Sequence, residues 1–140
     1  MRFSLLLSLA LCGSALAQAP TTPKAGSPER KALMDALRVP IEKLVKQKVI
    51  FQVDHLKVLG QWAFMTGKPR TSKGTALDYK NTRYQEYIEQ GAFDDGVCAL
   101  FKKSKGKWSV TRYSLGATDV PWDGWDKSFG APRAIFPYGN

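Results

Sequence analysis

The residues best suited to binding chemistry lie in a short stretch near the C-terminus. Two tryptophans and two aspartates form a candidate ligand site there: Asp119, Trp122, Asp123 and Trp125. Aromatic faces bind the CH groups of a ligand, and carboxylates accept hydrogen bonds from hydroxyl or ammonium groups. The stretch therefore fits a sugar-binding or peptide-binding pocket. The alternative is structural, with both tryptophans closing the open end of a sheet while the aspartates cap turns or pair with lysines.

A second stretch concentrates positive charge at a turn between two predicted strands. It holds four lysines: Lys102, Lys103, Lys105 and Lys107. Near an anionic surface each lysine contributes about 1 kcal/mol, so this turn could contact a phosphate-bearing lipid or a cell-wall polymer. The alternative is a solvated hairpin tip, whose charge also prevents pairing between sheet edges. No aromatic residue within the run could stack on bases, and we therefore predict no nucleic-acid partner.

Few residues in the chain suit catalysis or metal binding. There is 1 histidine and there are 2 cysteines, whereas a zinc site needs about three or four protein ligands. His55 and Cys98 could pair as base and thiolate, but both lie in stretches with strand character, where such lone residues are ordinarily structural. The spacing of Asp119, Asp123 and Asp126 does not match a calcium-binding loop. We therefore predict no catalytic residue, no metal and no cofactor.

The first 17 residues are typical of a secretory signal. Arg2 supplies a positive charge, and residues 4–13 form an apolar run shorter than the roughly 20 residues that span a bilayer. Ala15 and Ala17 then provide the small residues of a cleavage site. We expect cleavage after Ala17, a periplasmic or secreted protein, and no transmembrane span in the mature chain. A buried N-terminal helix is the alternative, which the prolines just after this segment disfavour.

Removal of the signal changes the cysteine count and the charge. Cys12 is a candidate for lipidation, but Leu11 stands before it where lipoproteins carry a small residue. With the signal gone, Cys98 is the lone cysteine and no internal disulfide can form. The net charge is +9 for the whole chain, and Arg2 is the single charged residue of the signal, which leaves +8. Such a balance favours an anionic partner.

The mature chain is expected to begin with a linker and then a helix. Residues 18–27 lack large apolar groups and predict a disordered linker before a single domain over 28–140. Ser27 suits the N-cap of a helix and Pro28 its first position. One apolar stripe follows at helical spacing: Leu33, Leu37, Ile41 and Leu44. Pro40 either kinks this helix or opens a second short one.

Two hairpins follow, because β-branched and aromatic residues alternate between turn signals. They pair residues 49–59 with 62–66, and residues 97–101 with 108–113. Gly60 and Gln61 form the first turn, and a bulge near Asp54 and His55 restores the interrupted alternation of the first strand.

Between the hairpins we expect a basic loop over residues 67–78 and a short helix over 83–90. Thr82 and Gln85 fit a capping box, in which the Gln85 side chain reaches back to the Thr82 amide. Gly91 suits the left-handed position that ends the helix.

The order of elements indicates an α+β fold. An N-terminal helix packs on a four-stranded antiparallel sheet made of two hairpins, with a short intervening helix and a long C-terminal coil. This topology resembles the cystatin-like and NTF2-like domains, a likeness that implies no activity. Residues 51–64, 91–95, 116–122 and 135–137 resemble a family of small exported bacterial proteins of unknown function, and the resemblance covers most of 28–137. It implies a single exported domain and brings no site residues.

These observations favour an exported, non-enzymatic accessory or binding domain. Its expected partner is an envelope polymer, an anionic lipid or a periplasmic protein. One alternative is a small enzyme with a cone-shaped pocket, in which Asp54, His55 or Asp119 serves as acid or base. Another is an inhibitor or immunity protein directed against an acidic effector, since like charge would repel a basic target.

Overall fold

Helix α1 (Pro28–Val45) begins at the predicted cap. Ser27 Oγ accepts a hydrogen bond from the Arg30 amide at 3.3 Å, and Pro28 occupies the first turn. The predicted apolar stripe lies on the buried side of the helix: Leu33, Leu37 and Ile41 are fully buried. Pro40 lies inside a single continuous helix and therefore does not begin a second one.

The computed structural model describes residues 18–138, so the predicted signal peptide and Cys12 lie outside the described residues. After α1 the elements follow in this order: β1 (Ile50–Leu59), β2 (Trp62–Arg70), α2 (Tyr84–Glu89), β3 (Val97–Ser104), β4 (Lys107–Leu115), α3 (Trp125–Phe129) and the 3-10 helix η1 (Arg133–Ile135). The strands form one antiparallel sheet in the order β1-β2-β3-β4. The predicted α+β class is therefore confirmed. None of the helices in the described part of the chain combines the length and apolar character needed to span a bilayer.

Strand β2 is longer than predicted and includes the start of the expected basic loop. Pairing with β1 continues to Ile50 opposite Arg70, beyond a bulge between Val53 and His55 that the sequence predicts correctly. Pro69 is tolerated because β3 pairs with β2 only as far as Gly67, so the missing proline N–H leaves no ladder bond unmade.

Helix α2 is capped differently from the prediction. Thr82 Oγ1 does accept a hydrogen bond from the Tyr84 amide at 3.2 Å. The Gln85 side chain, however, donates to Glu89 on the next turn and does not reach back, so the capping box is absent. The helix is short, at 6 residues, and Gly91 follows it with a φ of 68°, as its position predicts.

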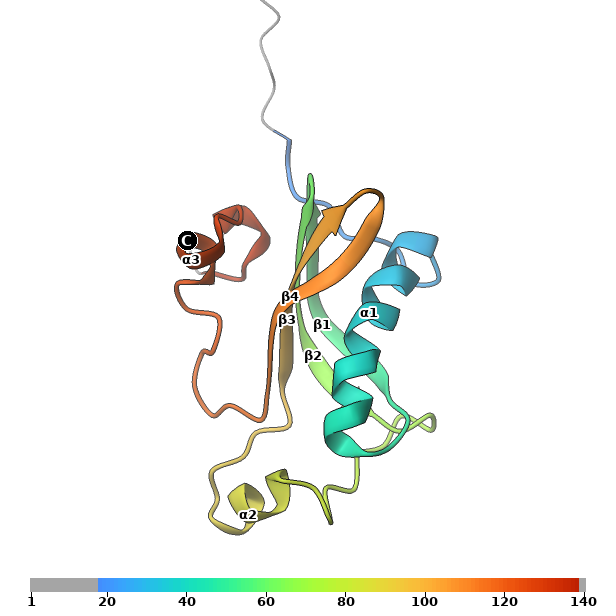
Figure 1. Ribbon diagram of the computed structural model, residues 1–140, viewed down its shortest axis with the longest axis vertical. Coiled ribbons are helices and arrows are strands. Elements are labelled where there is room, and N and C mark those ends of the chain that lie inside the picture. The colour runs from blue at the N-terminus through green and yellow to red at the C-terminus, as the bar shows by residue number, and fades with distance from the viewer. Residues whose placement is uncertain (1–17, 139–140) are drawn as a thin grey trace, which may run out of the picture.

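The sheet separates two apolar cores. One lies between the sheet and α1 and includes Met65, Ala99 and Phe101; the other lies under the C-terminal segment and includes Phe64, Leu100 and Ile135. Figure 1 shows α1 on one side of the sheet, with α3 and the end of the chain on the other. The C-terminal segment thus acts as a third layer, because both faces of the central strands are apolar.

Part of the expected linker is held against the sheet. Thr21 and Val58 exchange two backbone hydrogen bonds, of 2.9 and 2.8 Å, and Thr22 Oγ1 donates to Leu56 O at 2.9 Å. Pro23, two residues along, is buried. Residues 21–23 therefore differ from a disordered linker, since short polar residues supply the backbone groups that the edge of β1 requires.

Candidate functional site

The two tryptophans of the predicted ligand site have different surroundings. Trp125 is 8% exposed and packs edge-on against Phe64, with ring centroids 6.3 Å apart. Trp122 is half-buried, and its ring centroid lies 5.6 Å from that of Phe64. Both side chains therefore cover a face of the sheet, whereas the structural interpretation placed them at its open end. Trp125 is a core residue.

A small polar pocket does form beside Trp122. It has a volume of about 260 Å³, and its polar side chains come from four separate segments: Asp54, Thr66, Lys68, Asp94, Thr118 and Asp119. Two of the four predicted site residues, Asp119 and Trp122, line it. Asp123 and Trp125 do not. The sequence offered no signal for Thr66 or Asp94, because strand pairing and the bend before β3 bring them to the pocket.

The polar pocket lacks an activated nucleophile. Cys98 lines it, but burial raises the pKa of this thiol to about 12, so the thiol stays protonated near neutral pH. His55 is directed elsewhere, with Nε2 2.7 Å from Ile135 O. In the sheet His55 pairs with Thr66, which pairs with Cys98. Two strand spacings put roughly 10 Å between the backbones of His55 and Cys98, too far for direct proton transfer.

The remaining acidic residue of the stretch is structural. Asp126 is 7% exposed, accepts a hydrogen bond from the Tyr138 hydroxyl at 3.3 Å, and pairs with Arg133 at 3.5 Å. Within residues 18–138, no cluster of three or more histidine, cysteine or acidic side chains is arranged to hold a metal ion.

The four lysines of the β3–β4 hairpin do not form one cluster, because strand alternation directs them to different sides. Lys102 lies over the ring of Trp62 at 4.9 Å, while Lys103, on the opposite face, lies over Trp108 at 5.6 Å. Lys105 and Lys107 remain exposed at the tip. Lys105 has a φ of 50° and Gly106 a φ of 76°, the pair of left-handed residues that a tight two-residue hairpin turn requires.

A larger concavity runs between α1 and the outer side of β4. Two adjoining pockets of about 580 and 570 Å³ share Pro40, Leu44, Arg83 and Tyr113. We call them together the β4 groove. The remaining lining residues are Lys43, Lys46, Tyr84, Val110, Thr111, Arg112, Ser114 and Leu115. The groove thus combines apolar and aromatic walls with four cationic side chains.

No negative charge offsets those cations inside the β4 groove. Among the described residues, no carboxylate lines either pocket, and none forms an ion pair with Lys43, Lys46, Arg83 or Arg112. Burial raises the pKa of the Tyr84 phenol, so this hydroxyl stays neutral at physiological pH. Lys46 donates a hydrogen bond to Asn81 O, an uncharged acceptor, at 2.9 Å.

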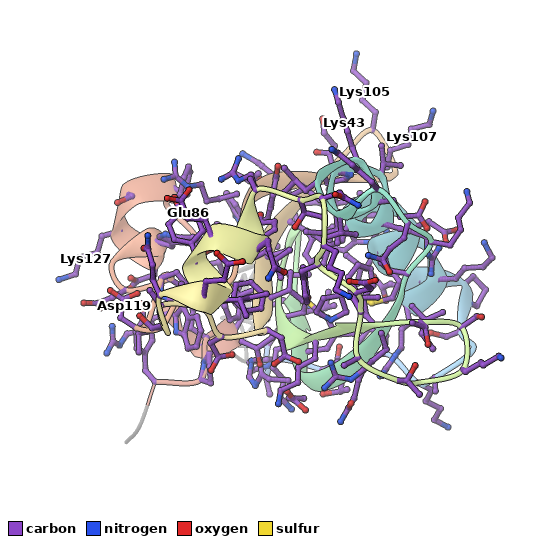
Figure 2. The ribbon with its side chains drawn as sticks, turned by 90° about the horizontal axis from the view of Figure 1, so that it is seen from below. Lys43, Glu86, Lys105, Lys107, Asp119 and Lys127 are labelled. Atoms are coloured by element: carbon purple, nitrogen blue, oxygen red, sulfur yellow. The ribbon has the colours of Figure 1, made fainter. Side chains whose placement is uncertain are left out.

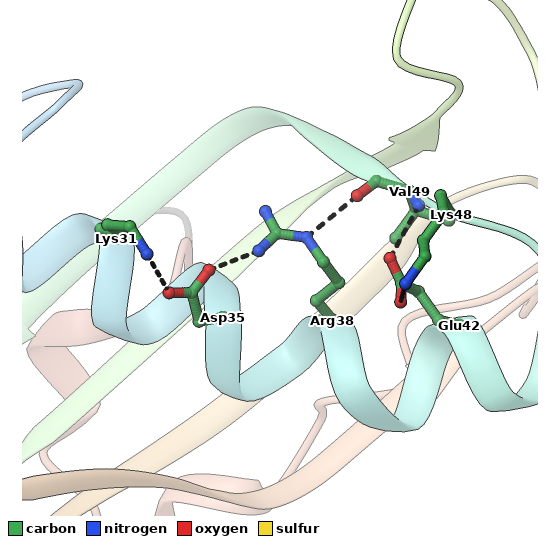
Figure 3. Close-up of polar contacts among 6 residues, drawn as sticks. All are labelled: Lys31, Asp35, Arg38, Glu42, Lys48 and Val49. Atoms are coloured by element: carbon green, nitrogen blue, oxygen red, sulfur yellow. Dashed lines mark hydrogen bonds and ion pairs between the residues drawn. The ribbon is translucent and has the colours of Figure 1, made fainter.

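Three other cations of α1 and its flank, Lys31, Arg38 and Lys48, are paired with carboxylates. Figure 3 shows Asp35 between Lys31 and Arg38, and Arg38 Nε donating to Val49 O at 3.0 Å. Glu42 accepts from the Val49 amide at 3.1 Å and pairs with Lys48 at 3.6 Å. Both hydrogen bonds hold the residue before β1 against the helix. Charge on this side is used for structure, while charge at the groove is left without a partner.

The unpaired cations extend to the hairpin tip. Figure 2 shows Lys43, Lys105 and Lys107 projecting together at the top of the view, whereas Glu86, Lys127 and Asp119 lie at its left, away from them. We call Lys43, Lys46, Arg83, Arg112, Lys105 and Lys107 the basic face. The sequence placed its emphasis on the hairpin lysines. The four groove cations could not be predicted as a group, because the packing of α1 and α2 beside β4 brings them together.

Comparisons with protein-family models, with curated proteins and with solved structures found no match to this chain. The resemblance to small exported proteins and to cystatin-like or NTF2-like domains therefore stays a prediction.

Proposed function

We propose that this protein is an exported, non-enzymatic binding module that holds an anionic partner on its basic face. The observation that carries the proposal is the groove of four cationic side chains without a carboxylate, continued by Lys105 and Lys107 at the hairpin tip. Export rests on the sequence of residues 1–17. The expected partners are the anionic components of a cell envelope, or an acidic protein in the same compartment.

We favour a binding role over catalysis because the candidate nucleophile and the single histidine are both constrained, although Asp54 and Asp119 do line one pocket. In the polar pocket, the thiol that could act as nucleophile is kept protonated by burial, and the single histidine is held by a backbone carbonyl. The β4 groove offers four cations and two tyrosines, side chains that bind anions and stack on apolar groups. The module could also act as an inhibitor of an acidic effector, since the same face would then cover the effector.

The direct test is binding of the chain from Gln18 to Asn140 to inorganic polyphosphate and to poly-L-glutamate. The substitutions Lys43→Glu and Arg112→Glu together replace two cations by two anions in the groove. We expect affinity to fall about ten-fold or more, because each cation near an anionic surface contributes about 1 kcal/mol. Binding by the unchanged protein should also weaken as salt rises, since the screening length falls from about 10 Å at 0.1 M to about 3 Å at 1 M.

The matched control is Lys127→Glu, which changes a cation that lies away from Lys43, Lys105 and Lys107, at the left of Figure 2. It should leave affinity within about two-fold of the unchanged protein, because Lys127 lines neither pocket of the groove. Equal losses in the control and the double variant would overturn the proposal, as would failure of the unchanged protein to bind either polyanion at low salt.

A further inference from the structure

The β4 groove lies along the edge of a strand and not on a face of the sheet. Its lining includes six consecutive residues, Val110–Leu115. Successive side chains of a strand point to opposite faces, so a pocket on one face would be lined by alternate residues. A bulge at Thr111 interrupts this alternation, but residues 112–115 beyond it pair regularly with β3 and still line the pocket without a gap. A pocket lined by every residue must open onto the backbone edge. β4 is the last strand of the sheet, so this edge is where a fifth strand would pair.

The backbone groups directed into the groove can be assigned by alternation. The amide of Gly116, just after β4, donates to Gly96 O at 3.1 Å, which directs Gly116 toward the β3 side. In an antiparallel pair, residues alternate between those bonded to the neighbouring strand and those whose N–H and C=O point away. Ser114 therefore bonds toward β3, while Tyr113 and Leu115 direct their N–H and C=O groups outward. No backbone group in the described part of the chain is bonded to them from that side.

Charge decides which kind of strand fits this edge. A second copy of β4 would bring its own Arg112 and Lys107 beside those already present, and like charges along an edge oppose pairing. An acidic strand would instead place carboxylates beside Lys43, Arg83 and Arg112 while its backbone pairs with Tyr113 and Leu115. A polyanion without amide groups would leave those donors and acceptors unpaired.

We infer that the β4 groove binds an extended acidic segment of a partner protein, which adds to the sheet as a fifth strand beside β4. The inference rests on the proposed function and names its partner class. Strand addition of this kind takes affinity from main-chain hydrogen bonds and specificity from alternate side chains. With a rise of about 3.4 Å per residue, about six residues of the segment would span Val110–Leu115.

The test uses two synthetic peptides with acetylated and amidated ends. The probe alternates glutamate with threonine or valine over about seven residues. The control peptide has the same sequence, with N-methyl groups on the alternate residues whose amides would face β4. This keeps the charge and removes the hydrogen bonds. Binding is measured by fluorescence anisotropy, and hydrogen exchange of the Tyr113 and Leu115 amides is measured by NMR with and without the probe.

We expect the unmethylated probe to bind about ten-fold or more tightly than the methylated one, and exchange at Tyr113 and Leu115 to slow by at least about five-fold when it binds. Equal affinities, or unchanged exchange at both amides with the probe bound, would overturn strand addition and leave anion binding intact. Failure of both peptides while polyphosphate binds would overturn the acidic-segment inference alone. Failure of peptides and polyphosphate together would overturn the proposed function as well.

Discussion

The two edges of the sheet are treated in opposite ways. The segment before α1 lies along the edge of β1, where Thr21 and Val58 exchange backbone hydrogen bonds of 2.9 and 2.8 Å. At β4, the edge opens into a groove with cations around it. An exposed strand edge invites pairing with another chain, and proteins cover such edges or charge them. This protein covers one edge with its own backbone and charges the other.

The two edges therefore differ in the partners that they can bind. The covering of β1 uses a neutral segment of threonine and proline, which satisfies backbone groups and attracts no charged partner. The edge of β4 offers the same kind of backbone groups with a positive surrounding. It therefore excludes copies of itself and admits an acidic strand. We call the β1 edge, which Thr21 covers, the closed edge, and the β4 edge the open edge. Changes near the two edges should have different effects.

The largest effect is expected from Gly67→Ala, on the closed side. A Cβ at this position would lie 2.2 Å from Gln52 O in β1, a backbone atom that cannot move without disturbing the pairing. We expect the free energy of unfolding to fall by roughly 1–3 kcal/mol or more, measured by urea denaturation.

The matched change on the open side is Gly106→Ala, at the tip of the β3–β4 hairpin. A Cβ there meets nothing within 4 Å, but the φ of 76° remains unfavourable for alanine. A loss of about 1 kcal/mol is expected. If Gly67→Ala cost no more than Gly106→Ala, the close approach between β1 and β2 would not be a constraint on the fold.

Opening the β1 edge should have an intermediate effect. Thr21→Pro removes the N–H that donates to Val58 O. We expect a loss of about 1 kcal/mol in the free energy of unfolding and faster hydrogen exchange of the Val58 amide, whose acceptor is Thr21 O. Ala19→Pro is the control, because no hydrogen bond from the Ala19 amide is formed within residues 18–138. Similar exchange rates at Val58 in both variants would mean that the bridge does not protect this edge.

The pH dependence of stability in acid should come from aspartates outside the groove, mainly Asp95 beside the ends of β2 and β3. Burial by itself would raise the pKa of Asp95, but the hydrogen bond from Arg70 at 2.8 Å, with the charges of Lys68 and Arg70, outweighs it and holds the pKa below its usual value of 3.8. The folded chain then binds fewer protons in acid than the unfolded chain. The stabilisation is complete above the unfolded pKa and is lost as pH falls through the folded one.

Thermal melts between neutral pH and strong acid would check this sign. Asp95→Asn should reduce the loss of stability on the acid side, with Asp35, whose pKa is also lowered by Lys31 and Arg38, supplying part of the remainder. Asp123→Asn is a suitable control, because Asp123 is exposed and forms no ion pair with any described residue. A steeper acid limb in the Asp95 variant would contradict the assignment.

The smallest effect on stability is expected at the open edge. Arg112→Gln removes an exposed cation that pairs with no carboxylate in the described part of the chain. The free energy of unfolding should change by less than about 0.5 kcal/mol in urea denaturation, while affinity for polyphosphate should fall. A loss above about 2 kcal/mol would show that Arg112 serves the fold.

Much of the fold could be predicted because its signals are local. The Ser27 cap, the hairpin turns at Gly60 and Gly106 and the bulge at Asp54 depend on residues within a few positions of each other. The extension of β2 through Pro69 could not be predicted in the same way. Proline ordinarily ends a strand, and it is tolerated here because β3 is absent beside it.

Only two of the four residues that the sequence predicted as a ligand site line the polar pocket. Asp119 and Trp122 are near in sequence and do line one pocket, whereas Asp54 and Asp94 reach it from other segments. Trp125, three residues after Trp122, is turned into the core by α3. Sequence spacing does not say which side of a short helix will meet the sheet.

By itself, the sequence determined the α+β class, the two hairpins, the helix start and the excess of positive charge. These follow from turn chemistry, alternation and composition, which act over short distances or over the whole chain. The tertiary structure alone decided which cations are neutralised and which are left along the β4 groove. It also decided that Thr21 covers one edge while the other stays open. Both depend on residues far apart in the chain, since packing brings Lys43, Arg83 and Arg112 to one edge.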